Sequence, residues 1–530
     1  MRVTPPIAPL PARDAQPALP QKLRADLTAA AFSVSTLTAL WGDDAERALH
    51  RNQRVPAIRR LDEQAVTPAS TLARLFVLGL DVPREQVERA LPTLGIDGAA
   101  ELGLMSAAGD SIRPLKDLRP YSFVDADGAG SWWIVSDLGE LSRPGPLDED
   151  HVLGVGGASM TLAGLMLQAR VDRVLDLGTG CGIQALHAAR HAKHVVATDI
   201  SDAALTTARL NADLNAVTNI EFRHGSLYEP VAGERFDRIV SNPPFVITPR
   251  RPGVPAYEYR DGGLVGDEIV RTVIVGSADH LVPGGTVQML ANWEYRAGET
   301  GSDRVARWLH DNAADALDSW VIEREVQSPE EYAETWIRDG GTREGTEKFN
   351  ALYGAWLDDF AERGVRQVGF GYVFLRRRDA SSGPVWNRHE RLLSAPGQNE
   401  AGLGVHIAAC VAAHDAQARL SDDDLAASTL VVAGDVTQEQ HHWPGSDDPT
   451  AIIVRQGGGF GRSIPVDTAL AALVGACDGD LSVGAITAAL AQLLEVDERA
   501  LRAQLLPRVR EFVDDGILSF ALPQKPDRQR

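Results

Sequence analysis

The sequence predicts a multidomain α/β protein: a doubly wound parallel sheet in the middle of the chain, flanked at both ends by smaller α+β domains. Three observations lead to this prediction. The chain has 530 residues, which at roughly 100–200 residues per domain corresponds to about three domains. Its middle alternates short apolar runs with helix-length segments, the pattern of strands joined by crossover helices. Both ends instead combine short helices with a few short strands.

Composition narrows the class of protein. Asp and Glu number 73 against 52 Lys and Arg, so the formal net charge of −21 excludes a uniformly basic surface, although a local basic patch stays open. Three widely spaced cysteines exclude a disulfide scaffold and a cysteine zinc site. No run approaches the ~18 apolar residues of a membrane span, and the first residues do not form a secretion signal. We therefore expect a cytoplasmic protein without a membrane partner or a bound metal.

The N-terminal part divides into a lead-in and a helical domain. Residues 1–18 contain five prolines and are expected to be disordered. Residues 19–140 show helical periodicity followed by strand-like pieces at 112–124 and 132–136, with a turn at Asp127-Gly128 between them. This order predicts a winged-helix-like domain. Such a domain serves either nucleic-acid binding or protein contact, and the acidic composition favours contact.

The central domain is expected at 141–380. Between its last two strands lie two probable helices, 329–338 and 347–363, of the kind inserted beside active sites. Residues 381–400 resemble a linker, and 401–530 again predict a winged-helix-like domain of helices and short strands. The strands predicted for the central sheet are 173–177, 195–200, 236–241, 286–290, 319–325 and 368–375.

A glycine turn follows the first of these strands. Gly178, Gly180 and Gly182 can adopt positive φ and let a ligand approach the backbone. Their G-x-G-x-G spacing differs from the dinucleotide-binding G-x-G-x-x-G. Asp176 ends the strand, where its carboxylate could hold an amino-acid ammonium, and Asp199 has the spacing of a ribose-binding acid on the second strand. An ammonium, a ribose diol and a positive centre together describe S-adenosylmethionine. The alternative is that Asp176 caps the helix and Asp199 is a turn residue.

A rigid loop follows the strand at 236–241. Pro243 and Pro244 remove two backbone donors and fix φ, so the loop's carbonyls are available as acceptors. Asn242 adds a side-chain acceptor and Phe245 a flat ring. This combination fits a planar group that carries an NH₂, either a carboxamide or an exocyclic base amine. Accepted hydrogen bonds would favour the pyramidal nitrogen of the attacking state. The alternative is an ordinary rigid turn.

With these motifs, the segment from about His151 to Leu290 resembles class I S-adenosylmethionine-dependent methyltransferases of the HemK-like group, which carry Asn-Pro-Pro-aromatic. That group includes glutamine-N5 methyltransferases of translation release factors, and related enzymes act on rRNA guanine or DNA adenine. The resemblance implies a Rossmann-like class I methyltransferase core with S-adenosylmethionine as cofactor. It implies cofactor-binding roles for Asp176, Gly178, Thr179, Gly180, Gly182, Asp199, Ile200, Ser226, Leu227 and Asn242, and catalytic roles for Asn242, Pro243, Pro244 and Phe245.

Two further segments belong to this expectation. Residues 257–266 look like the family's substrate loop, and the small-residue turn at 151–159 either closes over the cofactor or is an interdomain turn. Two positions depart from the pattern: Phe245 stands where the glutamine enzymes usually have Tyr, and Ser226 where an Asp is usual. The expected acceptor is a macromolecule, with protein glutamine ahead of an rRNA or DNA base (guanine-N2 or adenine-N6). A third possibility is a non-catalytic binding protein with a degenerate methyltransferase fold.

Overall fold

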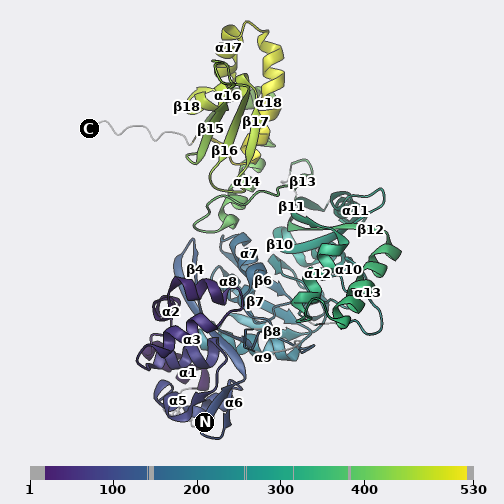
Figure 1. Cartoon of the computed structure of the whole chain (residues 1–530). Coiled ribbons are helices and arrows are strands. Elements are labelled where there is room, and N and C mark those ends of the chain that lie inside the picture. The colour runs from purple at the N-terminus through teal and green to yellow at the C-terminus, as the bar shows by residue number, and fades with distance from the viewer. Residues whose placement is uncertain are drawn as a thin grey trace, which may run out of the picture.

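The structure is a computed structural model that describes residues 18–139, 141–142, 148–255, 257, 259–313, 316–379 and 383–521. It consists of a body, which holds the N-terminal part and the central sheet, and a C-terminal lobe (Figure 1). The predicted disordered lead-in lies outside the described residues except for Ala18. No helix in the described ranges is long and apolar enough to cross a bilayer.

The N-terminal part is helical with a small sheet and a long hairpin. Its strands β1, β3 and β2 form one sheet in that order, and β4 pairs with β5 in the hairpin. The predicted strand at 112–124 is therefore split between two sheets, because the chain turns at Leu115. The elements are α1 (Leu19–Ala29), α2 (Val34–Leu49), α3 (Val55–Asp62), α4 (Pro68–Leu72), a π-helical turn (Ala73–Val77), β1 (Val82–Pro83), α5 (Arg84–Ala90), α6 (Gly95–Glu101), β2 (Met105–Ala108), β3 (Ser111–Pro114), β4 (Lys116–Asp125) and β5 (Gly128–Asp137).

Two asparagines connect this part to the central domain. Asn211 donates to the carbonyl oxygens of Val135 on β5 (2.9 Å) and of Cys181 in the glycine turn (2.8 Å). Asn215 donates to the carbonyl oxygen of Trp133 at 2.8 Å. Asn211 is fully buried, and a buried amide with paired donors and acceptor fixes geometry. The hairpin is thus anchored to the same turn that the sequence assigns to ligand binding.

The central sheet has eight strands in the order β13-β11-β12-β10-β9-β6-β7-β8. Strands β8, β7, β6, β9 and β10 are parallel, as predicted for the four of them other than β8, which was not among the predicted strands. Strand β12 runs antiparallel to both β10 and β11, which the alternation of strands and helices did not indicate. The bounds are β6 (Val171–Leu177), β7 (Ala192–Asp199), β8 (Ile220–His224), β9 (Phe236–Ser241), β10 (Leu281–Arg296), β11 (Leu317–Gln327), β12 (Val365–Arg377) and β13 (Asn387–Arg391).

Helices cover both faces of this sheet. Alternate strand residues point to opposite sides: Leu175 packs in the cluster formed with α10 and α11, whereas Val174 packs in the cluster formed with α8. This two-sided burial is why the strands are near-continuous apolar runs. The helices are α7 (Gly157–Leu165), α8 (Ile183–Ala189), α9 (Asp202–Leu214), α10 (Glu268–His280), α11 (Gly301–Ala313), α12 (Pro329–Asp339) and α13 (Glu347–Arg363), with a 3₁₀ turn at Glu229–Val231. The doubly wound α/β class is thereby confirmed.

The C-terminal lobe is also α+β. Its strands form two three-stranded sheets, β18-β14-β19 and β15-β16-β17, and a separate hydrophobic core joins them to the helices. The α+β composition agrees with the prediction, while the winged-helix comparison of both end domains stays a prediction. The elements are α14 (Leu403–Gln417), α15 (Asp422–Ala427), β14 (Thr429–Val432), β15 (Val436–His441), β16 (Ala451–Gln456), β17 (Ser463–Val466), α16 (Thr468–Ala476), β18 (Asp478–Ser482), α17 (Val483–Leu493), α18 (Glu498–Asp514) and β19 (Leu518–Phe520).

The segment between body and lobe contains β13, which lies within the predicted linker 381–400. It extends the central sheet by pairing in parallel with β11, and charged side chains connect it to the lobe. Glu390 accepts hydrogen bonds from Arg462 of the lobe (2.7 Å) and from Trp320 of β11 (2.6 Å). Arg388 forms an ion pair with Asp515 at the end of α18. This polar cluster, Arg388, Glu390, Arg462 and Asp515, is called the junction network below.

Candidate active site

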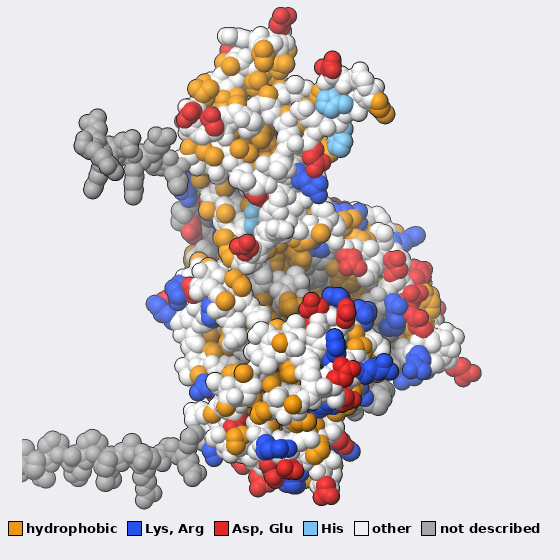
Figure 2. All heavy atoms as spheres, turned by 60° about the vertical axis from the view of Figure 1, so that its left-hand side comes forward, with side chains coloured by type: hydrophobic (Ala, Val, Ile, Leu, Met, Phe, Trp, Pro, Cys, Tyr) orange, Lys and Arg blue, Asp and Glu red, His pale blue; other side chains and the backbone are white. Residues whose placement is uncertain are grey.

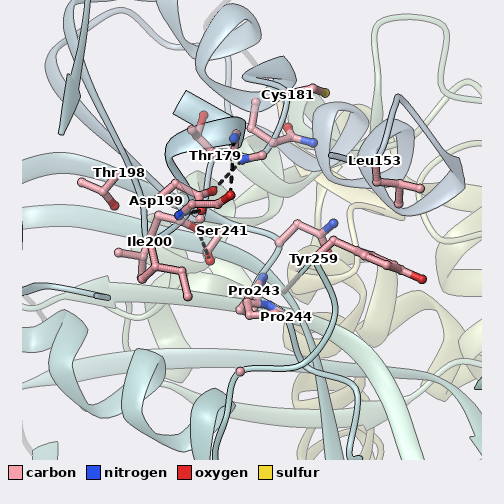
Figure 3. Close-up of a pocket in the computed structure, with 18 of the residues that line it drawn as sticks. Leu153, Thr179, Cys181, Thr198, Asp199, Ile200, Ser241, Pro243, Pro244 and Tyr259 are labelled. Carbon is pink, nitrogen blue, oxygen red and sulfur yellow. Dashed lines mark hydrogen bonds between the residues drawn. The ribbon is translucent and has the colours of Figure 1, made fainter. Parts of the chain in front are cut away.

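A cavity of about 310 Å³ lies at the carboxyl ends of β6, β7 and β9. Strand order reverses between β6 and β9, and ligands of doubly wound sheets bind at such a switch point. The volume falls within the usual range for small-molecule sites. Its wall combines the glycine turn, the ends of β7 and β8, the loop after β9, the turn before α7 and the loop before α10. Figure 3 shows Asp199 and Ile200 on one side, Leu153 and Tyr259 on the other, and Pro243 and Pro244 below them.

The glycine turn forms one wall. Gly178 (φ 76°) and Gly180 (φ 54°) have left-handed backbone, and a Cβ on either would project into open space. The amides of Gly178 and Thr179 donate to the carbonyl oxygen of Thr198 on β7 at 3.0 and 2.9 Å. Gly182 is not on the wall, and a Cβ there would lie 2.9 Å from the Cβ of Ala208 on α9. The structure therefore gives Gly182 a packing role, while Gly178 and Gly180 form an open cradle.

Asp199 lies on the wall at the end of β7. Its carboxylate accepts from the amides of Gly180 (2.9 Å) and Ser201 (3.0 Å). Burial raises the pKa of this carboxyl above its usual value, against the effect of its backbone donors. Ile200 is half exposed beside it, and Ser226 and Leu227 adjoin it on the wall from the turn after β8. These four predicted residues are therefore brought together.

Asp176 is placed differently from the other predicted residues. It is completely buried and is absent from the cavity wall. One carboxylate oxygen accepts from the Thr179 hydroxyl at 2.6 Å, and the other has no hydrogen-bond partner among the described residues. Burial raises the pKa of Asp176 to about 7, although the Thr179 bond lowers it. The carboxyl thus stands behind the glycine turn, not at the surface that a ligand would touch.

The loop after β9 supplies the opposite wall. Ser241, Asn242, Pro243 and Pro244 all line the cavity. The Asn242 Oδ1 atom is buried and has no hydrogen-bond partner among the described residues. A buried acceptor without a donor costs on the order of 1–3 kcal/mol. A bound group that donates a hydrogen bond to this side chain would remove that cost.

Phe245 is not on the cavity wall. Its ring makes an edge contact with Phe370 on β12, with centroids 6.4 Å apart, and packs against three hydrophobic clusters. Its carbonyl oxygen accepts from Asn292 of β10 at 2.8 Å. In this structure the ring anchors the loop in the core, in contrast to the flat stacking face expected from the sequence.

The inserted helix α12 holds the two loops at the acceptor side. The Tyr332 hydroxyl accepts from the Ile247 amide at 2.9 Å and from Asn292 Nδ2 at 3.0 Å. Asp339, at the end of the helix, accepts from the Tyr259 hydroxyl at 2.8 Å and from Arg260 at 2.6 Å. The prediction that a helical pair inserted at 329–363 lies beside the site agrees with these contacts.

The sequence predicted the segments that form the cavity wall more accurately than the individual residues that line it. The turn at 151–159 and the loop at 257–266 both contribute to the wall. Gln184, Thr198 and Ile269 also line the cavity but were not singled out. Gln184 is two residues after the last glycine of the motif, and a polar residue in the otherwise apolar first turn of α8 was the available signal.

Comparison with known families agrees with the fold and the cavity. The sheet order and the site at its switch point define a class I methyltransferase fold. A family model described as "Methyltransferase small domain" matches residues 154–300. Residues 154–300 are therefore similar to the methyltransferase small domain family, in agreement with the resemblance found in the sequence. Two models described as "Domain of unknown function", DUF7059 and DUF7782, match residues 29–115 and 414–520.

Individual relatives match the same domain. The chain is 39% identical over 134 residues to a release factor glutamine methyltransferase of Xylella fastidiosa, covering 24% of this chain and 48% of the relative. It is 30% identical over 162 residues to a ribosomal protein uL3 glutamine methyltransferase of Bradyrhizobium diazoefficiens, covering 28% and 50%. The chain thus spans about half the length of these curated relatives. Among solved structures, the YcgJ protein from Bacillus subtilis covers 42% of this chain and 98% of its own, at 14% identity and a TM-score of 0.28.

Proposed function

We propose that this chain is an S-adenosylmethionine-dependent N-methyltransferase whose acceptor is a planar nitrogen of a macromolecule, with a protein glutamine carboxamide favoured. The observation that carries the proposal is the unpartnered Asn242 Oδ1, held between the end of β9 and two prolines in the wall of a cofactor-sized cavity. An NH₂ group bound there would satisfy this oxygen. The proposal requires neither an aromatic ring nor a general base at this position. It requires only a hydrogen-bond acceptor in a fixed place.

The wall fits the cofactor. Gly178 and Gly180 leave room for close approach to the backbone, and the Asp199 carboxylate can accept from a ribose diol. The described wall residues include no Lys or Arg, so no fixed cation opposes a sulfonium centre. When bound, S-adenosylmethionine supplies an electrophilic methyl group on a positively charged sulfur.

The chain's own residues then orient the nucleophile. A carboxamide nitrogen is a poor nucleophile because its lone pair is delocalised into the carbonyl. When its N–H groups donate to Asn242 Oδ1 and to loop carbonyls, the nitrogen favours a pyramidal geometry. This geometry resembles the transition state more than the ground state. Rigid placement of the two reacting atoms can supply roughly 7–11 kcal/mol of the barrier. The nitrogen becomes acidic as the N–C bond forms, so the proton can leave without a strong base.

The charge distribution favours a protein acceptor over a nucleic acid. Near the cavity, Leu153, Leu264 and Val265 are exposed aliphatic side chains, and the exposed acids Glu149 and Asp150 precede the wall turn. Residues 401–521 contain seven Arg and no Lys against seventeen Asp and Glu. Figure 2 shows hydrophobic and acidic side chains over much of this lobe, with few basic ones. Phosphate backbones require the opposite surface.

The test is methylation by wild type and by Asn242→Ala. We expect Asn242→Ala to lower kcat by roughly 10²–10³-fold, because it removes an acceptor used mainly in the transition state. Its affinity for S-adenosylhomocysteine should change less than about threefold. Full activity of the variant would disprove the acceptor assignment. Absence of turnover by wild type, with all candidate acceptors present, would favour the degenerate binding protein.

The acceptor class is decided separately. A lysate incubated with wild type and cofactor labelled in the methyl group should yield label that is removed by protease and resists nuclease. Label that is lost to nuclease would instead support the second candidate, an rRNA or DNA base. That candidate also predicts steeply salt-dependent binding to nucleic acid.

A further inference from the structure

Gln184 has an unused hydrogen-bond acceptor next to the glycine cradle. The residue lies in the first turn of α8, is only 4% exposed and lines the cavity. Its Nε2 donates to the Ser159 carbonyl oxygen of α7 at 2.8 Å, which sets the orientation of the amide. Its Oε1 is buried without a hydrogen-bond partner among the described residues. A group that completes this site must therefore be a donor.

The donors of the proposed cofactor can be assigned by elimination. Asp199, Ile200, Ser226 and Leu227 gather at the ends of β7 and β8, the side predicted for ribose and adenine. Asn242, on the other side of β6, is proposed for the acceptor nitrogen. The ammonium of the cofactor's amino-acid part is the remaining donor, and Gln184 Oε1 is the remaining buried side-chain acceptor of the described wall that has no hydrogen-bond partner.

The placement of Asp176 strengthens this assignment. The sequence predicts Asp176 as the ligand of the ammonium, but that carboxyl is completely buried and is not on the cavity wall. It nevertheless lies directly behind the glycine turn that leads into α8, where its carboxylate accepts from the Thr179 hydroxyl at 2.6 Å. A carboxylate behind the wall adds a favourable field for a cation without touching it. The direct contact with the ammonium is then made by a neutral acceptor on the wall.

We propose that Gln184 Oε1 binds the ammonium of S-adenosylmethionine, with the Ser159 carbonyl fixing its orientation and Asp176 as the charge behind it. This inference rests on the proposed function, since it presumes that the cavity holds this cofactor. It makes Gln184 a residue that distinguishes S-adenosyl amino acids from adenosyl thioethers lacking the amino group. The same side chain couples the first turns of α7 and α8.

The test is a double-mutant cycle between side chain and ligand, measured by calorimetric titration of the full chain. The probes are S-adenosylhomocysteine and its deaminated analogue, and the variant is Gln184→Met, which keeps the length but removes the acceptor. We expect the variant to bind S-adenosylhomocysteine about 10- to 100-fold more weakly, as for loss of a hydrogen bond to a charged group. The deaminated analogue should bind both proteins equally within about twofold.

Several outcomes separate this inference from the proposed function. Equal affinity of wild type and Gln184→Met for S-adenosylhomocysteine would overturn the inference alone. Equal weakening for both probes would also overturn it, because Gln184 would then only shape the cavity. Failure of wild type to bind S-adenosylhomocysteine would overturn the proposed function together with the inference.

Two controls guard against misfolding. Gln53→Met changes an exposed glutamine of the N-terminal part and should leave both affinities unchanged. If Gln184→Met does not fold, the ligand side of the cycle suffices: wild type should bind the deaminated analogue about 10- to 100-fold more weakly than S-adenosylhomocysteine. Equal binding of the two probes by wild type would disprove an ammonium contact.

Discussion

At the residue scale, this chain separates side chains that touch the cavity from side chains that support it. The sequence indicated both aspartates, Asp176 at the end of β6 and Asp199 at the end of β7, but it could not distinguish how deeply each is buried. Asp199 lies on the wall, whereas Asp176 is fully buried behind it. The sequence pattern did not indicate Gln184, because the orientation of its amide depends on Ser159. Ser159 is 25 positions away, and only the packing of α7 on α8 brings it close. Spacing along the chain does not encode such contacts.

The buried carboxyl of Asp176 predicts a pH dependence of stability. Its folded pKa of about 7 exceeds the unfolded value near 3.8, so the folded state binds the proton more tightly. Stability is fully retained below about pH 4 and is lost as the pH rises toward 7, by up to about 4 kcal/mol. Asp176→Asn removes this loss. We expect the Tm of the variant relative to wild type to rise between pH 5 and pH 8 in thermal unfolding scans of the ligand-free chain. A Tm difference that is the same at both pH values would contradict the prediction.

At the element scale, the buried elements could be predicted and the exposed ones could not. Strands β6 and β9 and helix α13 agree with the sequence pattern because each has a continuous apolar run or a clear apolar stripe. Strand β8 is only partly buried, and β13, with the sequence Asn-Arg-His-Glu-Arg, consists entirely of polar and charged residues. A strand of this composition is recognisable only from its hydrogen bonds to β11. The direction of a strand could not be predicted either, since an antiparallel central strand such as β12 is as apolar as a parallel one.

Helix α12 provides a test of how one element positions another. Tyr332→Phe removes the acceptor of the buried Ile247 amide, which costs on the order of 1–3 kcal/mol locally. We expect the loop after β9 to loosen, so that kcat for methyl transfer falls about tenfold while affinity for S-adenosylhomocysteine is retained. Tyr353→Phe, which changes the neighbouring helix and a 3.4 Å bond to Glu334, is the matched control and should behave as wild type. Parallel losses in cofactor affinity and kcat would indicate general destabilisation instead.

At the scale of the whole molecule, the C-terminal lobe is attached by buried charges as well as by apolar contacts. Arg462 contacts Glu390 and Asp515, and Arg388 contacts the same two carboxylates. Burial would raise the pKa of Glu390, but its bond to Arg462 and the charge of Arg388 hold it below the usual value. A four-charge cluster of this kind is specific in geometry, because removing any one member leaves an unpaired charge. The network thereby links the lobe to the edge strand β13 of the sheet.

Removing one member of the junction network should weaken this attachment strongly. Arg462→Met leaves two carboxylates facing one arginine, at an expected cost of about 3–5 kcal/mol. Hydrogen exchange should then accelerate in β13 and at the start of α14, while β6 and β7 stay protected. Arg455→Met breaks an exposed pair with Glu439 and should cost less than about 1 kcal/mol. Unchanged exchange in Arg462→Met would show that apolar packing alone secures the lobe.

The eighth strand has a consequence for any attempt to isolate the methyltransferase domain. β13 covers the backbone of β11 from Ser319 to Glu323, and without it that row of N–H and C=O groups would form a bare sheet edge. Bare edges recruit strands from neighbouring molecules. A fragment cut after β12 should therefore self-assemble and precipitate, whereas one that continues through Arg391 ends its sheet on the short, charged strand β13.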